Sequence, residues 1–516
     1  MKNIFYFTML TGLILAIGSC KKSFVTLYPE GQVNEGNFYK TTADFQEAVV
    51  GAYGPLRDAA NVAFYMEEMR SDNTFFDYNS KDRGGSDAEK LSEFLDDASN
   101  STIYTLWSAD FQGIQRTDII LDKIAAQQPA DMTDSAKNGI IGETKGLRAH
   151  YYFELVRLYG KVPLYLHEVT NSQNALLPRS PVDSVYAQII ADLTDAMAKL
   201  SPPTSFPQSG RITKGMVATE LGLVYLTLKQ YDKATPLLQS VTQMGYDLLP
   251  NYADVFKTAN KNSKESIFEV QYKSGTDGQA SSFIYDFIPV TPSTKVILGA
   301  DFSNTAGGWN IPTTDLISSY DSGDKRLDAS IGLIKGKLNS SIDFIADSVV
   351  SILTTDTSGE STGEIAKRFI KKQYNPPYTL QNNTDDDWPV YRYADALLML
   401  AESLNEQGQP GAALPYLNKV RQRAGLASTA VTDQAALRDI IAHERRVELA
   451  FENHRWFDLV RTGQAIPVMS AYGVRQIQTF PFLLPNSYNV TANKFIYAVP
   501  NREVMVNPAL GQNPGY

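Results

Sequence analysis

Two polar loops carry aromatic side chains whose chemistry is non-covalent binding. The first loop, RSDNTFFDYNSKDRGGSD (residues 70–87), is rich in Asp, Asn, Ser and Gly and displays Phe75 and Tyr78. The second loop, NTAGGWNIPTTD (residues 304–315), places Trp309 beside Asn310. A ring in such a loop can stack on a ligand or pack against a neighbouring helix. The sequence leaves both interpretations open for both loops.

Motifs for bond-making chemistry are missing from the sequence. His443 and Glu444 begin a sequence like HExxH, but Val447 stands where the second histidine is needed. Four histidines and one cysteine make a zinc site or a cysteine nucleophile a poor prediction. The chain also lacks the phosphate-binding GxxxxGK[ST] and GxGxxG patterns and the GxSxG serine motif. Paired carboxylates for glycoside hydrolysis stay possible, so the sequence favours binding over catalysis without excluding an enzyme.

The N-terminus resembles a bacterial lipoprotein signal. Lys2 precedes an apolar stretch from Ile4 to Ile17, and Ile-Gly-Ser-Cys ends at Cys20, the only cysteine. We expect residues 1–19 to be removed, Cys20 to carry lipid and residues 20–35 to form a tether. The alternative is an ordinary secretory peptide with an incidental cysteine. No later apolar run approaches the roughly 20 residues of a membrane span, so we expect contact with the membrane only through the lipid.

The charge balance is acidic. The full chain has a formal net charge of −10, which becomes −11 when Lys2 is removed with the signal. Binding a nucleic-acid backbone requires clustered Lys and Arg, so we expect no nucleic-acid partner. No sequence feature indicates a cofactor.

Helical periodicity dominates the rest of the chain. It predicts helices starting near Thr42 and over about 103–126, 136–159 and 181–200. Leu221, Gly222, Tyr225 and Ala234 have the spacing of a tetratricopeptide repeat, and a second copy begins at Leu400. The small residues of this motif let paired helices approach closely. We therefore predict a helical scaffold built of helix pairs.

A loop-rich insertion, about residues 259–387, separates the two repeat copies. Within it, residues 266–272 read as a short strand. The run Asp385 to Asp387 lacks the spacing of a calcium loop, so we predict a solvated turn there. Long irregular segments of compact proteins usually carry function or are disordered, and the sequence leaves both open for this insertion.

The stretch ERRVELAFENHRWFDLVRTG, residues 444–463, is predicted to be one interior helix ending at Gly463. Its glutamates 444, 448 and 452 form a column of like charges, which repel each other at this spacing. We expect Arg445 and Arg455 to neutralise the column in a buried network. His150, set among apolar neighbours, is predicted to be a core histidine.

The chain resembles the SusD/RagB family in several ordered motifs. They include RAHYYFELVRLYGKVPLY (148–165), GRITKGMVATELGLVYL (210–226), WPVYRYADALLMLAESLNE (388–406) and NPALGQNPGY (507–516), besides residues 444–463. This resemblance implies a single, mostly α-helical domain, residues 36–516, with about four tetratricopeptide-like helix pairs and a loop-rich ligand region that contains a few short strands. It implies an outer-membrane lipoprotein that serves a SusC-like TonB-dependent barrel. The ligand-contact candidates that it puts forward are Arg70, Asp72, Asn73, Phe75, Tyr78, Trp309 and Asn310. Some members have an acidic run after the lipidated cysteine, but this chain has Lys21 and Lys22 there. Export to the cell surface is therefore inferred from the expected barrel partner and not from the signal.

The leading hypothesis is a non-catalytic lipoprotein that binds nutrient oligosaccharides. A second hypothesis is a repeat scaffold that binds peptide in its helical groove, and a third is a glycan-cleaving enzyme. The sequence names neither the ligand nor its linkage.

Overall fold

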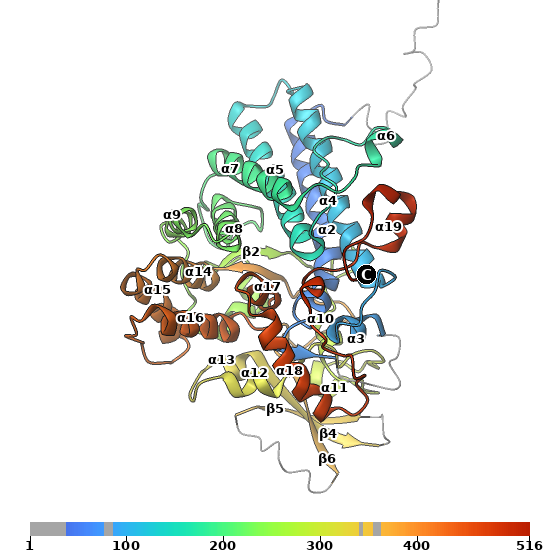
Figure 1. Cartoon of the computed structure of the whole chain (residues 1–516), viewed down its shortest axis with the longest axis vertical. Coiled ribbons are helices and arrows are strands. Elements are labelled where there is room, and N and C mark those ends of the chain that lie inside the picture. The colour runs from blue at the N-terminus through green and yellow to red at the C-terminus, as the bar shows by residue number, and fades with distance from the viewer. Residues whose placement is uncertain (1–37, 77–85, 340–343, 354–362) are drawn as a thin grey trace, which may run out of the picture.

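Four helix pairs form the frame of the molecule. The structure is a computed structural model that describes residues 38–76, 86–339, 344–353 and 363–516. The pairs are α2 (Thr42–Glu67) with α4 (Ser101–Ala126), α5 (Asp134–Tyr159) with α7 (Val182–Lys199), α8 (Lys214–Thr227) with α9 (Tyr231–Val241), and α14 (Tyr393–Glu406) with α15 (Pro410–Arg423). Figure 1 shows them along the top and left of the view. This arrangement confirms the predicted helix-pair scaffold.

The motif residues explain how closely the pairs approach. A Cβ atom added at Gly222 on α8 would lie 2.8 Å from the Leu238 side chain on α9. Outside the motif, a Cβ at Gly113 on α4 would lie 2.2 Å from the Tyr151 ring on α5, a helix of the next pair. Such distances are too short for close-packed interiors to accept, so glycine sets the separation of the helices.

Helix ends follow the sequence signals. Thr41 accepts a hydrogen bond from the Asp44 backbone N–H, and the Asp44 carboxylate accepts from the Thr41 N–H, which starts α2 with a capping box. The chain leaves α5 through Gly160, whose φ of 69° favours glycine.

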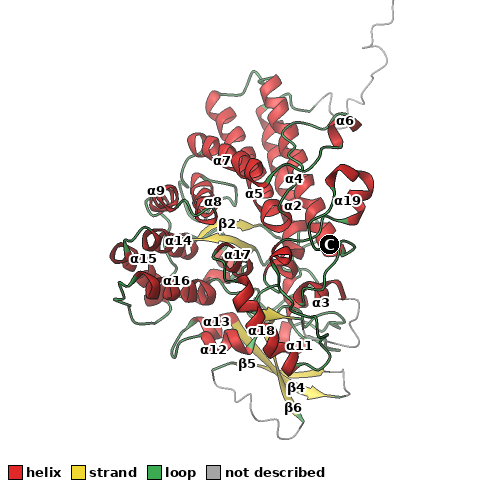
Figure 2. Cartoon of the chain, viewed as in Figure 1, coloured by secondary structure: helices red, strands yellow, loops and turns green. Residues whose placement is uncertain are grey.

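Shorter helices and strands complete the fold (Figure 2). The remaining α-helices are α3 (Ser86–Ser92), α6 (Ser172–Ala175), α10 (Phe283–Phe287), α11 (Lys295–Leu298), α12 (Thr314–Ser319), α13 (Arg326–Ser330), α16 (Gln434–Glu448), α17 (Arg455–Arg461), α18 (Ala465–Thr479) and α19 (Asn501–Val506). The strands are β1 (Thr74–Phe75), β2 (Ser266–Val270), β3 (Ile311–Pro312), β4 (Ile331–Leu338), β5 (Phe344–Ser351), β6 (Glu364–Ile370) and β7 (Trp388–Arg392).

The strands belong to three antiparallel sheets. One has the order β5-β4-β6, and the other two are the pairs β1-β3 and β2-β7. Pairing of Ser266 with Arg392 and of Val270 with Trp388 brings the two ends of the insertion together. The insertion therefore leaves the helical frame and returns to it at the β2-β7 pair.

The prediction of one continuous helix over residues 444–463 is wrong. The helix α16 ends at Glu448, a turn follows, and α17 begins at Arg455. Phe451 and Asn453 have φ values of 68° and 67°, and their backbone N–H groups donate to the Glu68 carboxylate at 2.9 and 3.1 Å. Glu68 lies on a distant segment of the chain, so local periodicity could not reveal the break. Gly463 ends α17 with a φ of 76°.

The predicted solvated turn at Asp385 to Asp387 is also wrong. Asp386 is buried and accepts a hydrogen bond from Asn375 Nδ2 at 2.7 Å. Asp387 accepts from the Tyr272 backbone N–H at 2.7 Å and pairs with Lys261 at 2.9 Å. These carboxylates fasten the base of the insertion.

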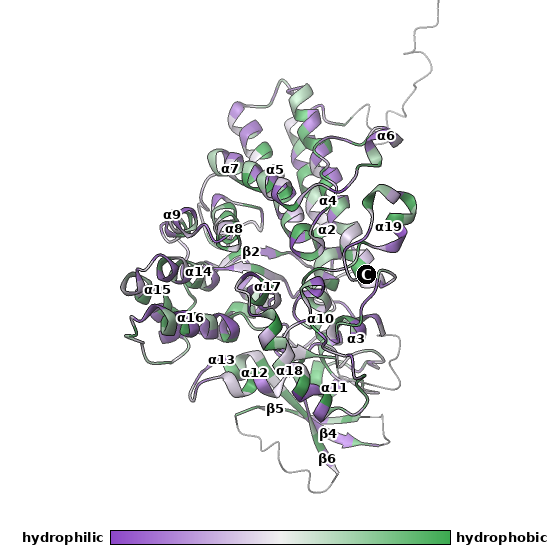
Figure 3. Cartoon of the chain, in the orientation of Figure 1, coloured by the Kyte–Doolittle hydropathy of each residue, from purple (hydrophilic) through white to green (hydrophobic). Residues whose placement is uncertain are grey.

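Apolar residues line the contacts between helices, and polar residues cover their outer turns (Figure 3). Within the described ranges, no helix combines the length and apolarity that crossing a bilayer requires.

Candidate functional site: a groove beside the β1-β3 pair

A buried ion-pair network joins the insertion to the helical frame. We call it the Glu448 network: Asp324, Arg326, Lys372, Arg392, Arg423, Glu265, Glu444, Glu448 and Glu452. Glu448 receives hydrogen bonds from Arg326, Arg392 and Arg423 at 3.1, 3.0 and 2.5 Å. Burial raises the pKa of Glu448, but these cations outweigh burial and hold it well below its ordinary value. The Glu448 network is structural.

The sequence predicted this network but assigned it the wrong arginines. Arg445 pairs with Asp395 and Asp458, and Arg455 pairs with Asp72. The cations that neutralise the glutamate column come instead from the insertion, β7 and α15. Long-range partners of this kind cannot be inferred from spacing along one helix.

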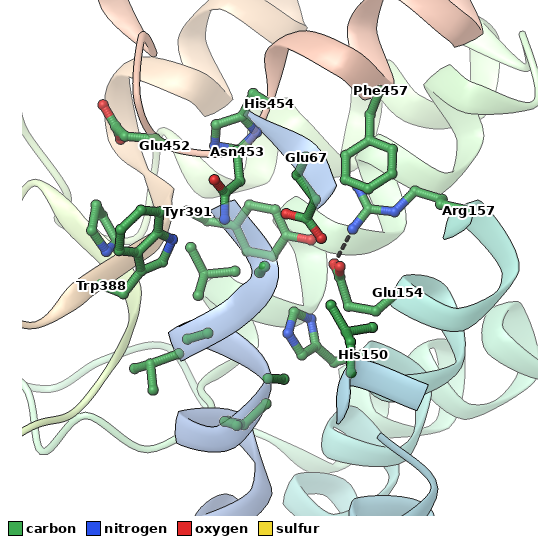
Figure 4. A pocket seen from close by; sticks show the side chains of 18 of the residues that line it. Glu67, His150, Glu154, Arg157, Trp388, Tyr391, Glu452, Asn453, His454 and Phe457 are labelled. Atoms are coloured by element: carbon green, nitrogen blue, oxygen red, sulfur yellow. Dashed lines mark hydrogen bonds and ion pairs between the residues drawn. The ribbon is translucent and has the colours of Figure 1, made fainter. Parts of the chain in front are cut away.

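An interior cavity of about 70 Å³ lies between α2, α5 and the turn after α16 (Figure 4). Glu67, His150, Glu154 and Arg157 line it. Burial and the neighbouring Glu154 carboxylate raise the pKa of Glu67 well above its ordinary value. A cavity of this size holds a few water molecules and is too small for a sugar ring.

His150, which lines this cavity, is a core residue, as predicted. Its Nδ1 lies 2.7 Å from Glu220 Oε2.

The β1-β3 pair brings the two aromatic loops together. Phe75 pairs in register with Ile311, so the segment that precedes Tyr78 lies beside the segment that contains Trp309. The Phe76 and Trp309 rings stack with centroids 6.5 Å apart. Two candidate segments distant in sequence are thus neighbours in the fold.

Most of the polar candidates are internal. Arg70 is fully buried, pairs with Asp96 at 2.6 Å and lies between the Phe94 and Tyr497 rings. The expectation that Arg70 contacts a ligand therefore has no support in the fold.

Asp72 and Asn73 are buried as well. Asp72 pairs with Arg455 and Arg446, each at 2.8 Å. Asn73 donates to Glu68 at 3.0 Å and accepts from Arg446 at 3.0 Å. These two residues hold the loop against α16 and α17 and expose no polar group to a ligand.

Trp309 and Asn310 hold polar groups that lack partners among the described residues. In that part of the chain, Trp309 Nε1 and both side-chain polar atoms of Asn310 are buried and find no hydrogen bond. An unpaired buried polar group costs about 1–3 kcal/mol, so water or ligand atoms are the expected partners. Tyr78 and Cys20 lie outside the described residues.

Phe75 lines an open groove that the sequence did not reveal. The groove has a volume of about 520 Å³. Its lining residues are Phe75, Thr313, Thr314, Asp315, Ser318, Arg368, Arg475, Gln476, Thr479 and Phe480. They come from β1, the start of α12, β6 and the end of α18. The Phe75 and Phe480 rings stack, with centroids 5.4 Å apart and planes inclined by 30°.

The groove has the composition of a site for a small polar molecule. Ligand pockets of proteins measure roughly 300–1,000 Å³ and combine apolar walls with a few placed polar groups. Here the two phenylalanines supply the apolar wall, and hydroxyl, amide and guanidinium groups surround them. Phe480 follows α18 in a stretch without periodicity, and only its pairing with Phe75 marks it as a site residue.

A second groove, of about 490 Å³, lies among α9, α14, α16 and α17. Three of its arginines pair with carboxylates of α14 and α17: Arg438 with Glu406, Arg445 with Asp395 and Asp458, and Arg461 with Glu402 and Asp458. The other two, Arg446 and Arg455, pair with Asp72. These cations hold helices to one another, so their charge is already neutralised.

Comparison with known proteins agrees with this architecture. Residues 264–516 match the model of the SusD family, and residues 32–226 match a model described as "Starch-binding associating with outer membrane". The chain belongs to the SusD/RagB family. Its SusD relatives include SusD-like protein P38 of Formosa agariphila, 27% identical over 549 residues that cover 100% of this chain and 99% of that protein. The starch-binding protein SusD of Bacteroides thetaiotaomicron is 23% identical and 77% of each chain is covered.

Solved SusD structures share the fold. A laminarin-binding SusD-like protein has a TM-score of 0.72 at 27% identity, with 93% of this chain and 100% of that chain covered. Surface glycan-binding protein A of Bacteroides thetaiotaomicron, in complex with laminarihexaose, has a TM-score of 0.72 at 22% identity, with 91% and 99% covered.

Proposed function

We propose that this protein is a non-catalytic, lipid-anchored outer-membrane protein that binds oligosaccharides and delivers them to a SusC-like TonB-dependent transporter. The observation that carries the proposal is the open groove with the stacked rings of Phe75 and Phe480. Membership of a family whose relatives include starch-binding and laminarin-binding proteins supports it.

The groove would bind sugar by stacking and hydrogen bonding. The apolar face of a pyranose ring would rest on Phe480, and its hydroxyl groups would meet Thr314, Ser318 and Gln476. Gln476 lines the groove, and its Oε1 accepts no hydrogen bond from the residues that the structure describes, so it can accept one from a sugar hydroxyl. The partly exposed Trp309 would extend the contact beyond the β1-β3 pair, whereas Asn310 is fully buried and would not touch the sugar.

The binding test uses the purified mature protein and a panel of neutral and acidic oligosaccharides. Isothermal titration calorimetry should find at least one that binds, and Phe480→Ala should weaken that binding. The control is Val474→Ala, because Val474 is exposed on the same helix and does not line the groove. Equal affinity of the parent and Phe480→Ala proteins for every bound glycan would reject the groove.

The non-catalytic part is tested by incubating the same panel with the protein. No shorter products should appear on chromatography after long incubation. Product release by the parent protein would establish the glycan-cleaving alternative.

The anchor and partner are tested in membranes. The Cys20→Ala protein should leave the membrane fraction, and the parent protein should copurify with a TonB-dependent barrel. Copurification with soluble peptide-bearing proteins, but with no barrel, would favour the peptide-binding scaffold instead.

A further inference from the structure

The groove contains an arginine with hydrogen-bonding capacity to spare. Arg475 is half exposed, with 51% of its side chain accessible, and projects from α18 into the groove. Its Nη2 donates to Asp315 Oδ1 at 3.0 Å. Within the described residues its Nε and Nη1 groups have no acceptor, so three N–H donors can still bind a ligand.

The carboxylate beside Arg475 is already shared. Asp315 Oδ2 accepts from Arg446 Nη2 at 2.9 Å. Arg446 in turn shares Asp72 with Arg455, so the pairs form the row Arg475–Asp315–Arg446–Asp72–Arg455. The row contains three guanidinium groups and two carboxylates. Its surplus positive charge is most accessible at the exposed end, which is Arg475.

A second guanidinium lines the groove from another element. Arg368 extends from β6, and its Nη1 donates to the Pro312 carbonyl at 3.1 Å. Asp315 is the only acidic side chain among the described lining residues, against Arg368 and Arg475. The described lining of the groove thus contains two guanidinium groups and one carboxylate, in a chain whose net charge is −10.

We propose that this groove selects sugars that carry an anionic group, either a carboxylate or a sulfate ester, and that Arg475 binds that group directly. The inference rests on the proposed function, since it names the class of glycan. A guanidinium presents paired N–H donors that match the oxygens of a carboxylate or sulfate, and such charge-assisted hydrogen bonds are stronger than neutral ones. Phe480, the residue that follows α18, would carry the apolar face of the same ring.

Anion selection has a physical consequence for this acidic protein. An anionic glycan is repelled at long range by the overall negative charge, so its binding depends on the local field of Arg475. Salt screens that field over about 8–10 Å at ordinary ionic strength. Binding of an anionic glycan should therefore weaken with added salt, whereas binding of a neutral glycan should not.

The test titrates the parent protein with oligosaccharides of equal length from three classes: uronate oligomers, sulfated galactan oligomers and neutral β-1,3-glucan oligomers. We expect a uronate or a sulfated oligomer to bind at least about tenfold tighter than the neutral one, which corresponds to about 1.4 kcal/mol. The stronger of the two anionic classes identifies the anionic group.

Variants separate the anion contact from general binding. Arg475→Gln should lose about tenfold in affinity for the anionic oligomer and little for a neutral one, and Arg475→Lys should recover part of the loss. The matched control is Arg502→Gln, which removes the same charge from α19, an exposed helix distant from α18 (Figure 1).

Failure of the inference is distinguishable from failure of the proposed function. Tight binding of neutral glucan that depends on Phe480, with Arg475→Gln unchanged for every class, would overturn anion selection and leave glycan binding standing. Absence of binding to all three classes would overturn both.

Discussion

Arginine occurs in two contrasting settings in this protein. In the Glu448 network, Arg392 is 1% exposed and meets Glu448, Glu452 and Glu265 at 2.6–3.0 Å. In the groove, Arg475 is half exposed and meets one carboxylate that Arg446 also holds. The same guanidinium chemistry therefore builds structure where it is enclosed and stays available to a ligand where it is open.

The largest expected effect on the free energy of unfolding comes from removing Glu448 from the buried network. Glu448→Ala leaves Arg326, Arg392 and Arg423 without their shared carboxylate, and removing one partner of a buried ion pair costs about 3–5 kcal/mol. Urea unfolding followed by circular dichroism measures the loss. Glu406→Ala is the control, because its partner Arg438 is half exposed and such pairs contribute about 0–1 kcal/mol. Equal losses in the two variants would contradict the distinction.

The Glu448 network also predicts that the free energy of unfolding depends on pH in the acid range. The pKa of Glu448 is lower in the folded protein than its ordinary value of 4.5, so its stabilising contribution is complete above about pH 4.5 and is lost as the pH falls further. The difference in unfolding free energy between the parent and Glu448→Gln proteins should be constant from pH 5 to 8 and shrink below pH 4.5. A difference that grows on acidification would refute this assignment.

A buried carboxylate with too few neighbouring cations should make stability depend on pH in the opposite direction. Burial, together with the Asp387 carboxylate, raises the pKa of Glu269 to about 7. Its stabilising contribution is therefore complete below pH 4.5 and is lost as the pH rises towards 7. Glu269→Gln should match the parent at pH 4 and exceed its stability at pH 8 by up to about 3 kcal/mol. Glu364→Gln, at an exposed position, should leave the free energy of unfolding unchanged at both pH values.

In the open setting, the aromatic pair should contribute a moderate amount. Phe75→Ala and Phe480→Ala should each lower glycan affinity about fivefold, or about 1 kcal/mol, because a ring contact is lost. The double variant should lose less than the sum of the two, since the rings stack on each other. Calorimetric titration of all four proteins measures this coupling. Full additivity would mean that the rings act at separate sites.

The smallest expected effect is on stability. Arg475→Gln should change the unfolding free energy by less than about 0.5 kcal/mol, because its ion pair is exposed and Asp315 keeps Arg446. Urea unfolding measured beside the binding assay would check this. A loss comparable to that of Glu448→Ala would place Arg475 among the structural arginines.

The sequence revealed the repeated parts of the fold more readily than the site. Gly222 and Ala234 mark a helix pair because close packing imposes a fixed spacing, and the capping box at Thr41 locates the start of α2. The break after Glu448 was missed because Glu68 creates it from a distant segment. Arg70, Asp72 and Asn73 have the composition of a loop, yet their partners bury them. Phe480 and Arg475 become site residues only through contacts with β1 and α12, which no local pattern records.

The β2-β7 pair has a consequence for how such proteins can diverge and be engineered. We call the insertion a cassette because its two ends meet on adjacent strands, and we expect that a relative's cassette can be joined there without changing how the flanking helices are connected. Any exchanged cassette must still supply cations at the positions of Arg326 and Lys372, or the acidic column of the recipient would be left uncompensated. Chimeras cut at these strands would replace the wall of the groove that comes from the insertion, Thr313 to Ser318 with Arg368, and would keep Phe75, Arg475 and Phe480 of the recipient.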